Sequence, residues 1–193
     1  FLSEARIARS IRHENVVAVH DYGLMNDGRP FMVMEYVDGI SLADLLEREG
    51  ALDPTRALLL AREIARGLAA AHAHGAVHLD LKPTNVILTG TELAPSDVKL
   101  IDFGASVRTG AIGEEGTPSH MSPEHACGEP TDARSDLYAL GVVLFEMLSG
   151  QLPFQSEDAH GLLRAHISQP APVVSSPHRP LPKAVTHLAG RLL

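Results

Sequence analysis

Several features that would set the chain apart from ordinary globular proteins are scarce or missing. Cys127 is the single cysteine, so no internal disulfide can form. The longest apolar run, Leu137 to Leu148, is interrupted by Glu146 and falls short of the roughly 18 to 20 apolar residues that a membrane-spanning helix needs. The first residues lack the charged-then-apolar pattern of a signal peptide. We therefore expect a cytoplasmic chain, or the cytosolic part of a larger membrane-anchored protein, whose own residues make no membrane contact.

Basic residues are also in the minority. The chain has 16 Lys and Arg against 24 Asp and Glu, which gives a formal net charge of -8. A negatively charged chain is a poor general ligand for polyanions, so nucleic acid is not an expected partner. The 193 residues, 45% of them hydrophobic and 21% charged, are typical of one soluble globular domain with a sizeable core.

Apolar residues at helical spacing predict four helices. They cover residues 1–12, 41–48, 53–75 and 135–150. Two of the starts carry helix-capping signals, because Ser41 is followed by Asp44 in a capping-box pattern and Asp53 precedes Pro54. The third of these helices is the most clearly marked, since both its ends and its buried face are indicated.

Short apolar or alternating runs between turn-forming residues predict five strands. They cover residues 16–22, 31–37, 76–79, 85–89 and 98–101. A turn at residues 25–28 is expected to join the first two into an antiparallel hairpin. Residues 170–182 are rich in proline and are expected to be irregular.

Two polar motifs flank the predicted central strands. The first is His78-Leu79-Asp80-Leu81-Lys82-Pro83-Thr84-Asn85, and the second is Asp102-Phe103-Gly104. Their order and spacing resemble the catalytic and metal-binding loops of protein kinases. The resemblance covers nearly the whole chain and implies an α+β, two-lobed kinase fold that consists mostly of the helical large lobe. Residues 1–37 would form the end of the small lobe and the hinge, and residues 38–193 the large lobe.

The resemblance assigns a role to each residue of these motifs. Asp80 orients the substrate hydroxyl and accepts its proton, and Lys82 neutralises the γ-phosphate of ATP. Asn85 and Asp102 hold Mg²⁺, a hard cation that takes oxygen ligands and few of them from protein. Structural roles fall to His78, Phe103 and Gly104. An isolated Asp or Lys on a loop is ordinarily a solvated surface residue, and the joint spacing favours the catalytic interpretation.

A later segment distinguishes protein kinases from small-molecule kinases. Residues 116–118, Gly-Thr-Pro, and 121–124, Met-Ser-Pro-Glu, resemble the end of a protein kinase activation segment, which holds a polypeptide across the active site. The resemblance implies that Thr117 hydrogen-bonds toward Asp80 and Lys82. The alternative within phosphotransfer is a small-molecule kinase of the aminoglycoside phosphotransferase type, which shares the Asp loop but lacks this segment. A generic Gly-Pro loop is the structural alternative.

Three acidic residues resemble structural residues of the family. Asp136 resembles the buried aspartate that hydrogen-bonds the catalytic-loop backbone, although an acidic residue in the first helical turn is also favourable by itself. Glu124 is expected to pair with an arginine near the end of the domain. Glu4 looks like the helix glutamate that pairs with a small-lobe lysine contacting the ATP phosphates.

Residues 34–37, Met-Glu-Tyr-Val, resemble the hinge that binds the adenine of ATP. The resemblance implies that the backbone of Glu35 and Val37 hydrogen-bonds the base, while Met34 acts as gatekeeper. Ile87 and Leu42 would pack against the adenine faces. In sequence alone these last two side chains look the same as core residues.

The small-lobe lysine and the Gly-rich loop of the family do not occur in the sequence. We expect them upstream of Phe1, and the last large-lobe helices downstream of Leu193. These 193 residues alone are therefore expected to bind ATP weakly and to be inactive.

Leu79 is a second departure from the family pattern, because many kinases carry an arginine there that pairs with a phosphate on the activation segment. Activity is therefore expected not to depend on activation-segment phosphorylation, although Ser106 and Thr109 could carry phosphate. His120 stands where a tyrosine is frequent in the family. His120 and His125 are expected to be exposed to solvent.

The resemblance predicts a bacterial-type serine/threonine protein kinase catalytic domain that phosphorylates proteins with ATP and Mg²⁺. The rival interpretation is a binding module without catalysis, either a pseudokinase or a truncated domain. Retention of the catalytic and metal-binding residues opposes the pseudokinase. The histidines at positions 72 and 74 lie two apart on a predicted helix and point to different sides, which disfavours a metal site.

Overall fold

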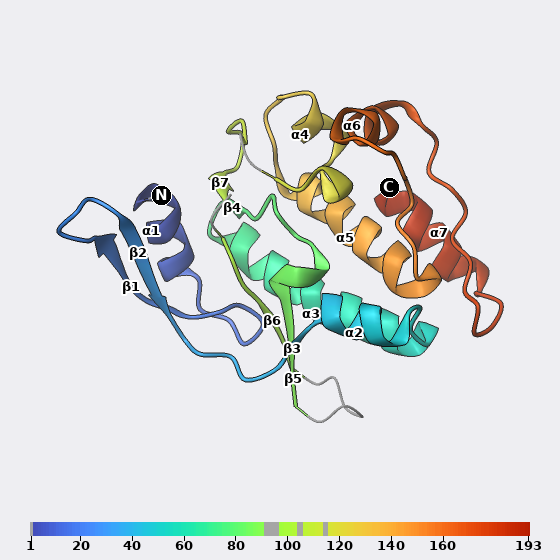
Figure 1. Ribbon diagram of the computed structural model, residues 1–193, viewed down its shortest axis with the longest axis horizontal. Helices are drawn as coiled ribbons and strands as arrows, with labels where there is room; N and C mark the ends of the chain where they lie inside the picture. Colours follow the sequence, from blue (N-terminus) through green and yellow to red (C-terminus); the bar gives the residue numbers. More distant parts are fainter. Residues whose placement is uncertain (1, 91–96, 104–105, 114–115) are drawn as a thin grey trace.

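The computed structural model describes residues 2–90, 97–103, 106–113 and 116–193 (Figure 1). The side chains of residues 2–4, 97 and 107 are not among those described. Two of the predicted site residues, the Glu4 side chain and Gly104, therefore lie outside the described part of the chain.

The N-terminal part consists of helix α1 (Leu2–Ser10) and a hairpin of strands β1 (Val19–Leu24) and β2 (Pro30–Met34), which pair antiparallel as predicted. β1 is displaced by three residues from the predicted start at Val16. The reason is that Val16 forms a bridge with Leu100, and Leu100 N–H donates to the Asn15 carbonyl at 2.8 Å. Asn15 and Val16 therefore pair with the end of strand β6 (Asp97–Leu100) and not with the hairpin.

Helices α2 (Leu42–Glu49) and α3 (Pro54–Ala73) begin as predicted. The Ser41 side chain accepts from the Asp44 N–H and the Asp44 side chain accepts from the Ser41 N–H, so the capping box is confirmed. The Asp53 side chain accepts from the Thr55 N–H at the start of α3. α3 is 20 residues long and presents its apolar stripe to α5 (Ala133–Ser149).

The central strands are short. β3 (Ile40–Ser41), β5 (Val86–Thr89) and β6 (Asp97–Leu100) form an antiparallel sheet in the order β3-β5-β6. β4 (Ala76–Val77) pairs with β7 (Val107–Arg108) in a separate ribbon. The predicted strands at 76–79, 85–89 and 98–101 are confirmed in position, whereas β3 and β7 were not predicted. Two 3₁₀ turns, η1 (Pro83–Asn85) and η2 (Pro118–His120), lie in the connecting loops.

The C-terminal part is helical. α5 is buried around most of its circumference and ends at Gly150, whose left-handed φ of 75° suits glycine. It begins at Ala133, two residues before the predicted start, because the Asp132 side chain accepts from the Arg134 N–H. α4 (Pro123–Ala126), α6 (Ala159–Ser168) and α7 (Lys183–Leu192) were not predicted, and the residues between α6 and α7 are irregular as expected.

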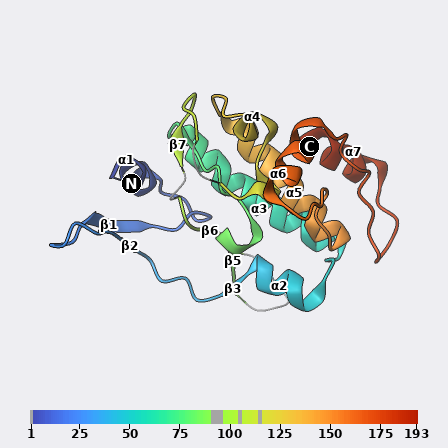
Figure 2. The same ribbon diagram turned by 45° about the horizontal axis from the view of Figure 1, so that its top comes forward.

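In both ribbon views, α1 and the β1-β2 hairpin lie at one end of the molecule and α5, α6 and α7 at the other (Figures 1 and 2). One apolar core joins the two ends, from Ala8 and Ile11 through α3 to Val185. The central strands lie between the two ends, so the loops that leave them are held by this core. In the described part of the chain, no helix is both long enough and apolar enough to cross a membrane.

Candidate active site

The loop between β4 and η1 brings the predicted catalytic residues together. Asp80 and Lys82 form an ion pair of 2.7 Å between Oδ2 and Nζ, and the two side chains are 14% and 27% exposed. Thr117, which lies 37 residues from Asp80 in the sequence, donates from Oγ1 to Asp80 Oδ1 at 2.6 Å. Lys82 Nζ donates to Thr117 Oγ1 at 2.8 Å. A carboxylate, an ammonium group and a hydroxyl therefore form a closed triangle between two distant loops.

The surroundings of Asp80 keep its carboxyl group ionised. Burial by itself raises the pKa of Asp80, but hydrogen bonds from Lys82 and Thr117, with the positive charge of Lys82, lower this pKa below the ordinary value. The carboxylate is thus an acceptor throughout the neutral pH range. An acceptor with a low pKa is a weak base, so its main capacity is to orient a hydroxyl group.

Asn85 and Asp102 are the two residues that the sequence predicts as metal ligands. Asn85 Nδ2 donates to the Asp80 backbone carbonyl at 2.9 Å and to Asp80 Oδ2 at 3.1 Å, which turns the amide so that Oδ1 faces away from Asp80. The Ile101 N–H donates to the Asn85 carbonyl at 3.0 Å and brings the two loops side by side. One carboxylate and one amide oxygen form a donor set that suits Mg²⁺ with substrate phosphates as the remaining ligands.

Two residues of this region have left-handed backbone conformations that are unusual for residues other than glycine. They are Leu79, with a φ of 63°, and Asp102, with a φ of 61°. Such conformations cost about 1–3 kcal/mol each and persist where the surrounding structure imposes them. Leu79 lies in the first of the two polar motifs and Asp102 in the second.

The Asp136 carboxylate hydrogen-bonds the backbone of the catalytic loop. The carboxylate is fully buried and accepts from the backbone N–H groups of His78 and Leu79, each at 2.9 Å. His72 Nε2 lies 2.7 Å from Asp136 Oδ2. The buried carboxylate thus holds the strained Leu79 backbone, and His72 of α3 is engaged in this contact. His74 contacts the Ala70 carbonyl.

His78 and Phe103 pack against each other between the two motifs. The His78 side chain is fully buried, and the two ring centroids lie 4.5 Å apart. His78 Nε2 lies 3.2 Å from the Ile101 carbonyl, so the ring also joins the catalytic loop to the end of β6. Neither side chain points at a place where a substrate would react.

The predicted hinge includes an ion pair that the sequence did not indicate. Glu35 Oε1 lies 2.5 Å from Lys99 Nζ on β6, and the Glu35 N–H donates to the Ala18 carbonyl at 2.9 Å. The N–H is therefore committed to the hairpin, and the carbonyl is the Glu35 backbone group that can serve adenine. Val37 follows outside any regular element, and Ile87 is half-buried in β5.

The adenine contact expected of Leu42 is wrong. Leu42 is 0% exposed and belongs to the central apolar core, because the capping box places it in the first turn of α2 with its side chain directed inward.

The expectation that His120 and His125 are exposed is also wrong. They are 7% and 5% exposed, because η2 and α4 pack against the helical end of the molecule. A Cβ atom placed on Gly113 would lie 2.5 Å from Leu79 Cδ1 and 2.8 Å from His125 Nε2. The backbone at position 113 thus contacts both Leu79 and His125, and a residue with a side chain would not fit there without a shift of these neighbours.

Glu124 accepts a hydrogen bond from the Ser135 hydroxyl at the start of α5. Glu124 and Arg191 of α7 line the same pocket of about 440 Å³. Arg134 at the start of α5 lines this pocket too, and its pKa is raised by the hydrogen bond and charge of Asp132 and, to a smaller extent, by the negative charge of Glu124.

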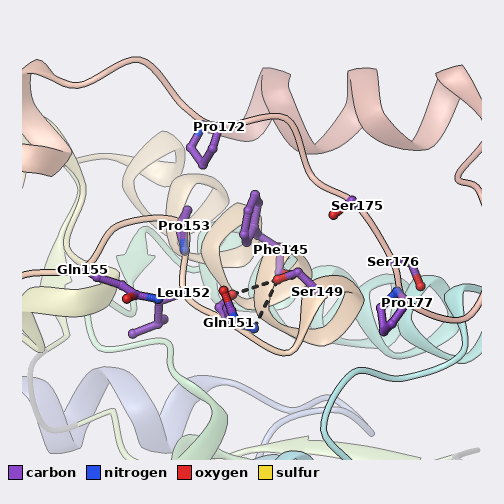
Figure 3. A pocket seen from close by; sticks show the side chains of 10 residues that line it. All are labelled: Phe145, Ser149, Gln151, Leu152, Pro153, Gln155, Pro172, Ser175, Ser176 and Pro177. Carbon is purple, nitrogen blue, oxygen red and sulfur yellow. Dashed lines mark hydrogen bonds between the residues drawn. The ribbon is translucent and has the colours of Figure 1, made fainter.

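A second pocket of about 600 Å³ lies between the end of α5 and the irregular segment that precedes α7 (Figure 3). The Ser149 hydroxyl accepts from the Gln151 N–H at 3.1 Å on its floor. None of the predicted catalytic, metal-binding or hinge residues lines this pocket. The candidate active site is therefore the junction of the catalytic loop, the Asp102 loop and Thr117.

The fold and this junction are typical of a protein kinase domain, with a large helical part, a predicted hinge at residues 34–37 and a segment whose Thr117 hydrogen-bonds Asp80. The sequence matches the protein kinase domain family over residues 1–192, and the chain belongs to that family.

Named bacterial relatives agree with this assignment. The chain is 36% identical to serine/threonine-protein kinase pkn3 of Myxococcus xanthus over 205 residues, which cover 100% of the chain and 38% of the relative. It is 42% identical to serine/threonine-protein kinase drp72 of Corynebacterium efficiens over 184 residues, 89% of the chain and 34% of the relative. It is 38% identical to serine/threonine-protein kinase PknD of Mycobacterium tuberculosis over 177 residues, 88% of the chain and 26% of the relative. The chain thus spans about a third of the length of these relatives.

Proposed function

We propose that the protein transfers the γ-phosphate of ATP to serine or threonine side chains of proteins, with Mg²⁺ as cofactor. The closed contact of Asp80, Lys82 and Thr117 is the observation that supports this most directly. In phosphoryl transfer the protein mainly positions the reactants and stabilises the charge on the transferring group. Asp80 can orient the attacking hydroxyl, and Lys82 can balance charge on the phosphate. Since ATP is the donor, the proposed reaction takes place in the cytoplasm.

The residues that would hold the metal are Asn85 and Asp102. Mg²⁺ bound there supplies positive charge to the phosphate oxygens. The hinge carbonyl of Glu35 and the backbone of Val37 would orient the adenine base, and Ile87 would pack against its face. Neither a Gly-rich loop nor a small-lobe lysine occurs within residues 1–193, so we propose that a polypeptide of these residues alone binds ATP weakly.

The test is phosphate transfer from γ-labelled ATP to myelin basic protein by the full-length gene product. We expect label on phosphoserine and phosphothreonine, loss of transfer with EDTA, and recovery when Mg²⁺ is added in excess. Asp102→Asn is expected to lower transfer at least about a hundredfold, which is the scale of an essential charge-stabilising group. Asp158→Asn, which changes an exposed helix-capping carboxylate of α6, is the matched control and should retain activity.

A full-length protein that neither transfers phosphate nor binds Mg-ATP would contradict the proposed function and support the binding module. Transfer to a small aminoglycoside in place of protein would support the small-molecule alternative.

We also propose that activity does not require phosphorylation of the activation segment. Leu79 is 6% exposed, and the backbone at Gly113 packs against its side chain. At this position Leu79 makes an apolar contact, whereas the arginine found in many kinases would bind a phosphate on the activation segment. Ser106 is 1% exposed and donates to the His78 carbonyl, which leaves Thr109 as the accessible hydroxyl of the two.

Thr109→Ala is accordingly expected to retain activity within about twofold of the wild type, since an exposed hydroxyl of this kind contributes little by itself. The measurement is kcat/KM on myelin basic protein after treatment with a phosphatase that is then removed. A loss of activity in Thr109→Ala that Thr109→Glu restores would show that a phosphate is needed.

A further inference from the structure

The turn η2 positions Thr117 in the active site. η2 begins directly after Thr117, whose carbonyl accepts from the His120 N–H at 2.9 Å. The turn packs against α5 and α6. Since Thr117 hydrogen-bonds Asp80, any contact that fixes η2 on the helices also fixes the distance between the substrate-binding segment and the catalytic loop.

The His120 side chain provides such a contact. Its Nε2 lies 3.6 Å from Glu146 Oε2 of α5, and the two side chains are 8% and 24% exposed. Neither of these atoms has a hydrogen-bond partner among the described residues. A largely buried carboxylate is costly without a compensating cation, and a protonated imidazole at this distance supplies one. On its other side, His120 Nδ1 lies 2.9 Å from the Ser119 hydroxyl.

Two further titratable groups on this face, Tyr138 and His166, are neutral at neutral pH. The Tyr138 hydroxyl lies 2.7 Å from His166 Nδ1 on α6. Burial, then positive charge on His120, lower the pKa of His166 to about 4, against a smaller opposing contribution from the Ser119 backbone. Burial raises the pKa of Tyr138 well above its ordinary value. Glu124 of α4 places a negative charge near Tyr138, and His125 of α4 lies against Gly116. His120 and Glu146 are the acid-base pair in contact between η2 and α5.

We propose that His120 is a positioning residue for the protein substrate, an inference that rests on the proposed kinase function. Its contact with Glu146 fixes η2 on α5 and keeps the substrate-binding segment in register with Asp80. The contact is stronger when the imidazole is protonated, because both partners are then charged. The KM for a protein substrate should therefore rise with pH. The KM for ATP should not, since the hinge and the metal-binding residues belong to other elements.

The experiment compares full-length wild-type protein with His120→Tyr and Glu146→Gln. Between about pH 6 and about pH 8, the interval in which histidine ordinarily titrates, the wild-type KM for myelin basic protein should rise about fivefold, a change of about 1 kcal/mol. His120→Tyr introduces the residue frequent in the family at this position, and Glu146→Gln removes the charge. Both variants should lose the pH dependence of KM and retain kcat.

His187→Gln, which changes an exposed histidine of α7, is the matched control and should keep the wild-type pH profile. The use of one substrate for every variant cancels the titration of the substrate itself. A wild-type KM that is flat with pH, or a His120→Tyr variant with the wild-type pH profile, would overturn the proposal.

A second measurement does not depend on catalysis. Hydrogen exchange by mass spectrometry on peptides covering residues 116–122 should be slower at about pH 6 than at about pH 8 in wild-type protein, after correction for the intrinsic rate, since histidine ordinarily titrates in this interval. Glu146→Gln should remove the difference. If wild-type protein fails to transfer phosphate, the kinase proposal fails while this measurement still decides the role of His120. Equal corrected exchange in wild type and Glu146→Gln would overturn that role.

Discussion

Asp80→Asn is expected to lower kcat for phosphate transfer about a thousandfold, within the range of about 10² to 10⁴ that a positioned acid-base group contributes. The amide can still accept from the Thr117 hydroxyl, but it has no negative charge for Lys82 and cannot accept the proton of the attacking hydroxyl. The metal-binding and hinge residues are unchanged, so the KM for ATP should change by less than about threefold. Initial rates over a matrix of ATP and protein concentrations separate these quantities.

Asp27→Asn is the matched control, because Asp27 pairs with Arg29 in an exposed turn of the hairpin and lies outside the active site. It should retain wild-type kcat. An Asp80→Asn variant with more than about a hundredth of wild-type kcat would contradict the role assigned to Asp80, because about a hundredfold loss is the smallest effect expected for such a group.

The low pKa of Asp80 also fixes the sign of the pH dependence. A carboxyl group with a depressed pKa is fully charged at any pH above the ordinary pKa of the group. It loses its charge only when the pH falls through the lowered pKa. Titration of Asp80 should therefore leave kcat unchanged from about pH 8 to about pH 6. A change in the KM for protein over that interval has a different origin, which separates the role of His120 from that of Asp80.

The local sequence predicted most of the elements near the site. The capping box of Ser41 and Asp44 and the Asp53-Pro54 start of α3 depend on residues a few positions apart, and such signals are read directly from sequence. The strands around the two polar motifs were placed within two residues of their observed bounds. The motif spacing identified the residues that the structure brings together, although their chemical roles stay predictions.

The remaining features depend on contacts that local spacing does not encode. The Asn15 side chain donates to the Val98 carbonyl across 83 residues, and this contact displaced the hairpin from its predicted start. The burial of His120 follows from packing against α5 and α6, whereas its place beside the substrate-binding segment suggested exposure. Lys99 and Glu35 likewise meet only when β6 lies beside the hinge. Each of these contacts requires the assembled fold.

The two acid-base pairs near the site differ in the roles proposed for them. Asp80 and Lys82 belong to the same loop and would act on the reacting groups directly. His120 and Glu146 lie on separate elements and would act through the backbone that carries Thr117. Substitutions in the first pair should therefore lower kcat, and substitutions in the second should change the KM for protein.

Asp136→Ala is expected to destabilise the protein by about 3–5 kcal/mol, the range for removing one partner of a buried charged network. The carboxylate is fully buried and accepts from the His78 and Leu79 N–H groups, which would lose their partners. Leu79 would also lose the contact that holds its left-handed backbone. For a domain of this size the loss corresponds to a decrease in Tm of about 10 °C.

The measurement is thermal unfolding followed by circular dichroism, together with kcat below the lowered Tm. Because the catalytic-loop backbone loses its anchor, kcat should also fall in molecules that remain folded. That loss should not add fully to the loss in Asp80→Asn, since both changes act on the same loop. Asp132→Ala removes the exposed N-cap of the same helix and should cost about 1 kcal/mol with little effect on kcat. Equal destabilisation by the two variants would mean that Asp136 acts only as a favourable charge at the start of α5.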